Sequence, residues 1–212
     1  MRSDHTRALR LARRYTWLFE GDPNSWDALA KVLMELEDFE EAEQALRRGL
    51  RAAPSPLLKH RLAELLTGLS RSEEARAVVD ELMTEAPGSP WPYQDMAYLA
   101  LYDEGPEVAK DYALQALARA SPRYSWTEYE VAKILLFIPG ERDRAIKLLQ
   151  AFSEKRPEEA LPHVLLAAIL EKSDPDAIKR HAEIAESLYG TDSARKVQED
   201  IQTFRSLYAG AE

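Results

Sequence analysis

The residues best suited to metal or acid–base chemistry in this sequence are its four histidines, His5, His60, His163 and His181. No two of them stand three or four positions apart, the spacing that places two metal ligands on one face of a helix, and no H-E-x-x-H motif occurs. The sequence also has no cysteine, which excludes thiolate metal sites and disulfides. We therefore predict no metal site and no catalytic histidine.

Motifs that bind phosphate groups or activate a serine are missing as well. Neither G-x-x-x-x-G-K nor G-x-G-x-x-G occurs, and there is no G-x-S-x-G turn. We expect no cofactor. The acidic cluster between Glu35 and Glu43 is interpreted as a solvated turn before a helix, whose N-terminus favours acids. A docking place for a basic segment is the alternative interpretation of this cluster.

Charge is unevenly distributed along the chain, whose net charge is −9. Residues 1–20 contain five arginines and two acids, giving +3, so the remainder carries −12. An acidic body repels nucleic acid and anionic membranes, and we expect neither as a partner. The arginines at the N-terminus are interpreted as the outer face of a helix. Its opposite, buried face is expected to hold Leu11, Tyr15 and Leu18.

Hydropathy gives no sign of a secreted or membrane protein. The first residues carry charges without the apolar core of a signal peptide. No stretch approaches the ~18 uninterrupted apolar residues that a membrane-spanning helix needs. Together with the missing cysteines, this favours a cytoplasmic location.

Residues 23–56 contain two runs with helical periodicity, separated by a break near Asp38. The apolar positions of the first run recur every three or four residues, as one face of a helix requires; they are Trp26, Leu29, Ala30 and Leu33. The second run ends at a proline, which stops a helix; its periodic residues are Phe39, Ala42, Leu46 and Leu50, followed by Pro54. Ser55, placed before Pro56, predicts the N-cap of a further helix.

This unit recurs along the chain. The alanine of the second helix returns in steps of 33, 34, 36 and 32, at Ala42, Ala75, Ala109, Ala145 and Ala177. A proline lies twelve residues after four of them, or directly beyond that place: Pro54, Pro87, Pro122 and Pro157. Ala8 stands one repeat length before Ala42, so the N-terminal helix has the pattern of a second helix without its first.

The pattern W-x2-L-A-x2-L, then A-x3-L, then P closely resembles the tetratricopeptide repeat family, whose unit is a helix–turn–helix of about 34 residues. The resemblance implies an all-α fold, a right-handed solenoid of antiparallel helix pairs. We predict a single domain over 1–212. Its parts are an N-terminal half-repeat helix at 4–21, repeats at 23–56, 57–89, 90–123, 125–157 and 158–190, and a C-terminal capping helix at 191–209.

The resemblance also implies that the first helices of successive repeats line a concave groove. The side chains expected to face it are Asn24, Asp27 and Lys31 in the first repeat, and His60 and Glu64 in the second. In the third repeat they are Trp91, Gln94, Tyr98, Leu101 and Tyr102. In the later repeats they are Ile134, Phe137, Leu166 and Ile169. This set predicts a groove that is polar in its N-terminal half and apolar in its C-terminal half.

These residues favour a non-catalytic scaffold or adaptor that binds a peptide or helix of a partner protein. Aromatic and apolar anchors would hold the partner, and cationic groups on it would suit the acidic body. One alternative is self-association, with the apolar half of the groove covered by a second subunit or by the chain's own helix at 192–208. Enzyme activity, or regulation of an enzyme, is a third hypothesis that no motif supports.

Overall fold

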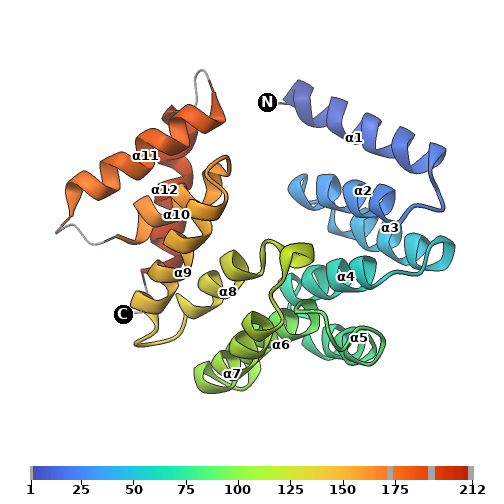
Figure 1. Ribbon diagram of the computed structural model, residues 1–212. Helices are drawn as coiled ribbons and strands as arrows, with labels where there is room; N and C mark the ends of the chain where they lie inside the picture. The colour runs from blue at the N-terminus through green and yellow to red at the C-terminus, as the bar shows by residue number, and fades with distance from the viewer. Residues whose placement is uncertain (1, 171–173, 191–193, 210–212) are drawn as a thin grey trace. The chain divides into compact units, whose positions relative to one another are not determined.

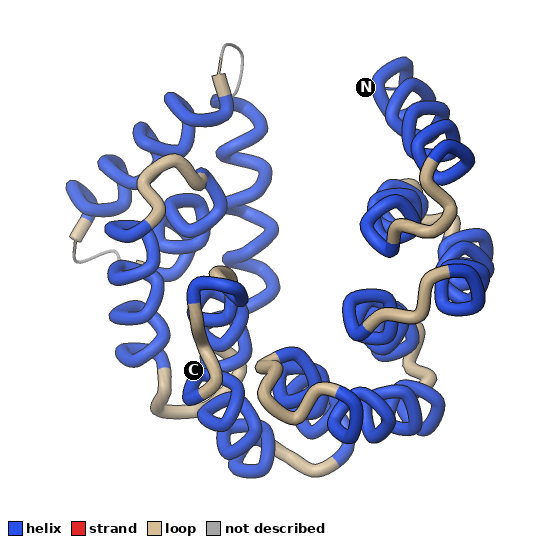
Figure 2. Tube along the Cα trace, turned by 45° about the vertical axis from the view of Figure 1, so that its right-hand side comes forward, coloured by secondary structure: helices blue, strands red, loops and turns tan. Residues whose placement is uncertain are grey.

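The computed structural model describes residues 2–170, 174–190 and 194–209. In these ranges all regular secondary structure is helical, with twelve α-helices and one 3₁₀ turn (Figures 1 and 2). The all-α prediction is therefore confirmed. Each α-helix has nine or more residues, and short connections join the packed pairs α2 and α3, α4 and α5, α8 and α9, and α10 and α11.

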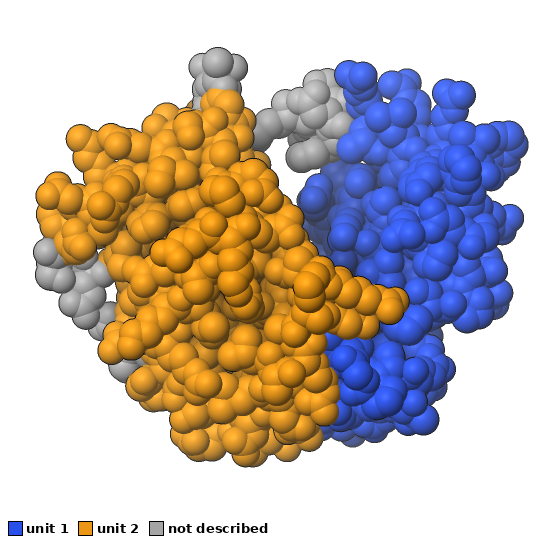
Figure 3. Space-filling model, in the orientation of Figure 1, with its two compact units in different colours: residues 1–99 blue, residues 100–212 orange. Residues whose placement is uncertain are grey.

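The chain forms two compact units, residues 1–99 and residues 100–212, coloured separately in Figure 3. The first holds α1 (Arg2–Leu18), α2 (Pro23–Glu35), α3 (Phe39–Ala52), α4 (Pro56–Gly68), α5 (Ser72–Glu85) and most of α6 (Trp91–Asp103). The second holds α7 (Pro106–Ala118), η1 (Pro122–Tyr124), α8 (Thr127–Leu135), α9 (Arg142–Lys155), α10 (Ala160–Ile169), α11 (Pro175–Tyr189) and α12 (Ala194–Tyr208). The prediction of a single domain stays a prediction.

Helix starts follow from short polar side chains placed before prolines. Asp22 and Ser55 cap α2 and α4, each accepting a hydrogen bond from a backbone N–H in the first helical turn. Pro23 and Pro56 then occupy the first helical position, where a missing N–H costs nothing. The N-cap predicted at Ser55 is confirmed.

Helix pairs within a repeat pack closely through small residues. The signature alanines Ala42, Ala75 and Ala145 are fully buried in α3, α5 and α9. In α3, a Cβ placed on Gly49 would lie 2.7 Å from Cγ of Trp26 on α2. The two helices therefore touch at a position that admits no side chain.

In the second unit, α10 is apolar around its whole circumference except for His163 and is buried from residue 162 to residue 169. It packs against α9, α11 and α12 (Figure 1). Helix α12 buries Val197, Ile201 and Tyr208 in this packing. Leu166 and Ile169, expected in an open groove, are 0% and 1% exposed, so that prediction is wrong.

Arginines satisfy the last carbonyl groups of α10. Arg142 donates to the carbonyl of Ile169 at 2.8 Å, and Arg205 donates to those of Ala167 at 3.1 Å and Ala168 at 3.4 Å. Such cations favour a helix C-terminus, whose carbonyls carry partial negative charge. The guanidinium of Arg205 thereby fixes α12 against the end of α10.

Helix α1 differs from the prediction made for it. It packs on α2 through a narrow face in which Ala12 is 7% and Thr16 is 5% exposed. Leu11, Tyr15 and Leu18, expected to be buried, are 55%, 37% and 53% exposed. The prediction is wrong because a lone second helix meets its neighbour on one side only.

Candidate functional site

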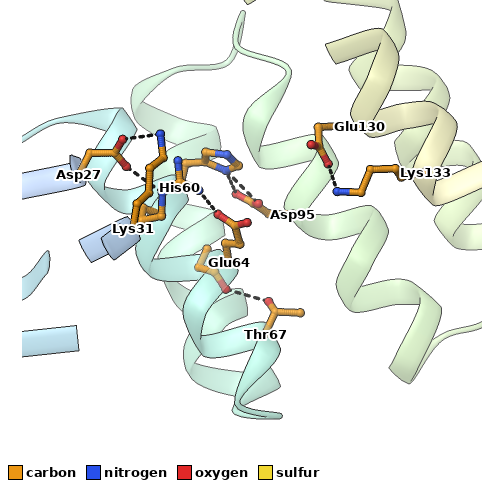
Figure 4. A network of polar contacts seen from close by, with 10 residues as sticks. Asp27, Lys31, His60, Glu64, Thr67, Asp95, Glu130 and Lys133 are labelled. Atoms are coloured by element: carbon orange, nitrogen blue, oxygen red, sulfur yellow. Dashed lines mark hydrogen bonds and ion pairs between the residues drawn. The ribbon is translucent and has the colours of Figure 1, made fainter. Parts of the chain in front are cut away.

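Charged side chains on the first helices of residues 1–99 pair from one repeat to the next. Arg61 on α4 donates through Nε to Asp27 on α2 at 2.7 Å, and Lys31 donates to the same carboxylate at 2.9 Å. Nδ1 of His60 lies 3.0 Å from both carboxylate oxygens of Asp95 on α6. Figure 4 shows Asp27, Lys31, His60 and Asp95 in these contacts. We call Asp27, Arg61, His60 and Asp95 the polar ladder.

The ladder is shielded from water, which sets the pKa values of its members. Burial opposes the charge of Asp27, but the guanidinium of Arg61 and the ammonium of Lys31 outweigh it and lower the pKa of this carboxyl. Burial likewise opposes protonation of His60, but the carboxylate of Asp95 outweighs it and raises the pKa of His60. Burial also raises the pKa of the Asp95 carboxyl, against the opposing effect of His60. The ladder is thus a set of partnered, largely buried groups rather than an exposed charged surface.

An aromatic ring flanks the ladder. The imidazole of His60 lies parallel to the indole of Trp91, with 5.1 Å between ring centroids and 4° between planes. Hydrogen bonding to Asp95 fixes the imidazole, and stacking on it orients Trp91. A histidine paired with a carboxylate also occurs in catalytic triads, where it activates a nucleophile. Stacking and pairing account for His60 here without such a reaction.

The predicted groove residues of residues 1–99 fall into three groups. Asp27 and Gln94 are 6% and 4% exposed, so the prediction that they face a partner is wrong. Asp27 is taken up by its pairing with Arg61, and Gln94 lies within the packed part of α6. Three polar residues lie at least partly open to solvent, namely Asn24, Lys31 and Glu64. Three more are half-buried, namely His60, Trp91 and Tyr98.

The last turn of α6 carries the two remaining residues expected from the third repeat. Leu101 is half-buried, whereas Tyr102 is 76% exposed. By contrast, Tyr93 and Met96 on the other face of α6 are 8% and 5% exposed. The helix therefore keeps one aromatic face for its core and leaves another in contact with solvent.

In residues 100–212 the expected open apolar groove is absent from the described first helices. Ile134 is fully buried, which contradicts its predicted role. Phe137 is half-buried, with its ring 4.8 Å from that of Tyr208 on α12. The half-buried positions of α8 include Glu130 and Lys133, which pair at 2.9 Å. The prediction of an apolar groove in this half failed because Ile134 is turned into the core and because α12 packs over α10.

Sequence reasoning missed Arg61 and Asp95, although a signal for them was present. Asp27 and Arg61 are 34 positions apart in the sequence, and His60 and Asp95 are 35 apart. Opposite charges one repeat apart on first helices are therefore placed to meet. A search for such pairs at the repeat spacing finds both contacts.

A second histidine site, also missed, lies between α10 and α11. Nδ1 of His163 and Nδ1 of His181 are 2.9 Å apart, so one ring donates its N–H to the other's lone pair. Burial lowers the pKa of both, and the pKa of His181 falls to about 4 with further contributions from His163 and Arg180. Among the described residues, no three histidines, cysteines or acids are grouped to hold a metal ion.

Comparison with known families agrees with the paired helices of residues 23–65. The family model described as Tetratricopeptide repeat matches residues 23–65, which span α2, α3 and most of α4. Residues 23–65 are therefore similar to tetratricopeptide repeats. Tetratricopeptide repeats mediate protein–protein interactions, and proteins built from them are in general non-catalytic scaffolds. Comparison with curated proteins finds no match to the sequence.

Solved structures support the same fold along most of the chain. The structure described as the APC/C hetero-tetramer Cut9–Hcn1 has a TM-score of 0.58 and 14% identity, over 94% of this chain and 40% of that one. The structure described as a human IFIT1 dimer with PPP-AAAA has a TM-score of 0.64 and 17% identity, over 93% of this chain and 48% of that one. YrrB, described as a TPR protein with an unusual peptide-binding site, has a TM-score of 0.50 and 12% identity, over 89% of this chain and 97% of that one. The chain thus spans less than half of the first two, and at these identities the likeness concerns the fold alone.

No described helix is a candidate for a membrane-spanning segment. None of them combines the length and the apolar character needed to cross a bilayer.

Proposed function

We propose that this protein is a non-catalytic scaffold that binds a peptide or helix of a partner protein along its first helices. The anchors are Trp91, Tyr98, Leu101 and Tyr102 on α6. The observation that carries the proposal is the outward aromatic face of α6, where Tyr102 is 76% exposed and Trp91 and Tyr98 are half-buried. The repeat core does not need these side chains, and aromatic residues are enriched among those that dominate binding energy.

The polar ladder supports this proposal by holding an anchor in place. Because His60 is hydrogen-bonded to Asp95 and stacked on Trp91, the indole keeps its orientation before a partner arrives. A preorganised side chain loses less conformational entropy on binding. Lys31 and Glu64 are exposed next to the ladder and offer charges of both signs for partner orientation.

The chemistry of the surface points to a partner with apolar or aromatic side chains and flanking cations. The net charge of −9 disfavours a nucleic acid, whose phosphates this body repels. The IFIT1 structure is described with PPP-AAAA, but its likeness to this chain concerns the fold. A cytoplasmic location for the complex rests on the sequence alone.

Self-coverage by the C-terminal helix is a second candidate for residues 100–212. The burial of α10 under α12 and the contact between Phe137 and Tyr208 support it. In that unit, the apolar residues of the first helices serve the protein's own core. This leaves α6 and the first unit as the surface for a partner.

The proposal is tested with peptides selected from a random library displayed on phage against the intact chain. Selected peptides should contain aromatic or branched apolar residues with nearby Lys or Arg. The double variant Tyr98→Ala, Tyr102→Ala should bind them about tenfold to a hundredfold more weakly, the scale of an interface hot spot. Leu188→Ala, at a 37% exposed position of α11, is the matched control. Equal affinity of the double variant and the intact chain contradicts the proposal.

A further inference from the structure

Helix α1 presents an apolar face that nothing in the described chain covers. Leu11, Tyr15 and Leu18 lie on one side of the helix and are 55%, 37% and 53% exposed. Next to this face, Phe19 is 52% exposed and its ring meets that of Tyr15 at 5.2 Å, edge to face. Contiguous exposed apolar side chains of this kind mark interaction sites in soluble proteins. We call Leu11, Tyr15 and Leu18 the α1 face.

The complete repeats of the chain show what covers the equivalent face elsewhere. One repeat length after Tyr15 the sequence has Gly49, and one repeat length after Leu11 it has Ala45. In α3 both equivalents are buried, and Gly49 lies directly against Trp26 of the first helix α2. Two of the three positions of this face are therefore closed in a complete repeat by an antiparallel first helix, whereas Ala52, one repeat length after Leu18, is exposed.

The fourth repeat gives the same result with a large side chain. Phe152 follows the signature alanine Ala145 by seven residues, as Tyr15 follows Ala8. Phe152 is 1% exposed, and its ring lies 5.9 Å from that of Tyr129 on the first helix α8. A bulky residue at this position is thus compatible with a covering helix. In α1 the equivalent position is Tyr15, which is exposed.

The charges beside the α1 face indicate which kind of helix could bind to it. Arg7 and Arg14 are four residues before and three residues after Leu11, so they border the α1 face, and both are exposed. Arg10 is exposed on the same helix. Residues 1–20 carry five arginines and two acids, against a strongly acidic remainder. A helix with acidic residues beside its apolar stripe complements this surface.

We propose that the α1 face binds an amphipathic, acidic α-helix of a partner protein, in the place that a first helix occupies in a complete repeat. This site is separate from the α6 anchors and does not depend on them. A second copy of the chain fits less well, because two α1 faces would bring arginines together. An anionic membrane fits less well, because the acidic remainder of the chain repels it.

The test uses a synthetic amphipathic peptide of about 18 residues, long enough to form a helix, with leucines at first-helix spacing and glutamates beside them. Fluorescence anisotropy of the labelled peptide should show saturable binding to the intact chain. The double variant Leu11→Asp, Leu18→Asp should bind about tenfold or more weakly. Both positions are more than half exposed, so circular dichroism should show an unchanged helix content. Leu207→Asp, at a 53% exposed position of α12, is the matched control and should bind normally.

Charge reversal provides the second arm. A peptide with lysines in place of glutamates should bind more weakly to the intact chain. The double variant Arg7→Glu, Arg14→Glu should prefer the lysine peptide. The variant Tyr98→Ala, Tyr102→Ala should bind the glutamate peptide normally, which separates this proposal from the proposed function.

Three results overturn the proposal. The first is an absence of saturable peptide binding, or equal binding by the Leu11→Asp, Leu18→Asp variant. The second is co-sedimentation with phosphatidylserine vesicles that this variant loses, which assigns the face to a membrane. The third is a dimer of the intact chain that this variant loses in sedimentation, which assigns the face to a second copy.

Discussion

The first helices of residues 1–99 meet through paired polar groups, whereas the first helix α10 of residues 100–212 is apolar except for His163 and lies under α12. Both follow the same repeat pattern, with buried alanines where the two helices of a pair meet. They differ at the positions that point away from the repeat core. Asp27 and His60 occupy such positions in the first unit, and Leu166 and Ile169 in the second. A repeat therefore fixes the packing of its helices and leaves its outer face to individual residues.

The histidines extend this comparison. His60 has a carboxylate partner, which favours its protonated form. His163 and His181 have each other and no carboxylate hydrogen bond among the described residues, so their neutral forms are favoured. The protonated form of His60 is thus favoured between the helices of the first unit. In the second unit, burial disfavours protonation of His163 and His181.

The largest effect is expected from removal of α12. A chain ending at residue 190 loses the side chains of Val197, Ile201 and Tyr208, which are 0%, 3% and 3% exposed. At roughly 1.5–3 kcal/mol for each, unfolding of the second unit should become easier by about 5 kcal/mol or more. Hydrogen exchange should show lost protection in α10 and unchanged protection in α2 and α3.

A point variant keeps this prediction testable if the shortened chain does not fold. Ile201→Ala should lower the free energy of unfolding by about 3 kcal/mol. Leu207→Ala, at an exposed position of the same helix, should change it by less than about 0.5 kcal/mol. Equal protection of α10 in the shortened and intact chains would show that α12 is not a cover.

The polar ladder should give the next largest effect. Arg61→Ala leaves the carboxylate of Asp27 buried, with only Lys31 to compensate it, and should cost about 3 kcal/mol in urea unfolding. The double variant with Asp27→Ala should cost less than the two single losses added together, because the charges that lose a partner, on Lys31 and Glu64, are exposed and no buried charge is left unpaired. Lys155→Ala serves as control, since its pair with Glu128 is exposed. Simple additivity would mean that the ladder is not a paired unit.

Two glycine-to-alanine substitutions within the first unit should change the free energy of unfolding in opposite directions. Gly49→Ala places a Cβ 2.7 Å from Cγ of Trp26 and should destabilise the protein by about 2 kcal/mol. Gly68→Ala meets no atom within 4 Å and should stabilise it by about 0.5 kcal/mol through a less flexible unfolded chain. Thermal unfolding distinguishes the two signs. Stabilisation by Gly49→Ala would contradict the close contact of α2 and α3.

The smallest effect is expected from pH. In the unfolded chain a histidine titrates near 6.5, whereas burial and neighbouring cations lower the pKa of His181 to about 4 in the folded protein. As the pH falls from about 6.5 toward 4, the unfolded state binds protons first. The full shift corresponds to about 3 kcal/mol, and because His181 is only half-buried, solvent screening reduces the expected loss of stability to about 1 kcal/mol. The raised pKa of His60 has the opposite effect on the pH dependence of stability. Its contribution is present below pH 6.5 and is lost as the pH rises through its folded pKa.

Proton NMR of the histidine rings measures both pKa values directly. His60 should titrate above 6.5, and His163 and His181 below it. His181→Gln should reduce the loss of stability on acidification. A titration of His181 near 6.5 would contradict the neutral pair.

The sequence was sufficient to predict the fold but only part of the site. The spacing of Ala42, Ala75 and Ala145 predicted the helix pairs, because a buried small residue is required wherever two helices cross closely. The exposure of Asp27 could not be predicted from its repeat position, since it depends on a cation one repeat later in the chain, Arg61. The more exposed residue of α8 is Lys133 rather than Ile134, so the register of this helix differs by one residue from that of the repeat pattern.

Predictions about covered faces failed for a related reason. The residues Leu11 and Tyr15 have the pattern of a buried helix face, but burial also needs a second helix. Leu166 and Ile169 have the pattern of an open groove, but α12 packs over α10. Periodicity shows which residues share a face, and a neighbouring element decides whether that face meets water.

The central claim is that a partner binds to the first-helix surface of residues 1–99 and to α6, and not to helices α7 to α12. Site-specific photo-crosslinking tests it most directly, with a photoreactive amino acid in place of Glu64, Tyr102 or Leu188 and peptides selected against the intact chain. The account predicts crosslinks from positions 64 and 102 and none from position 188. Crosslinks from position 188 alone would contradict it.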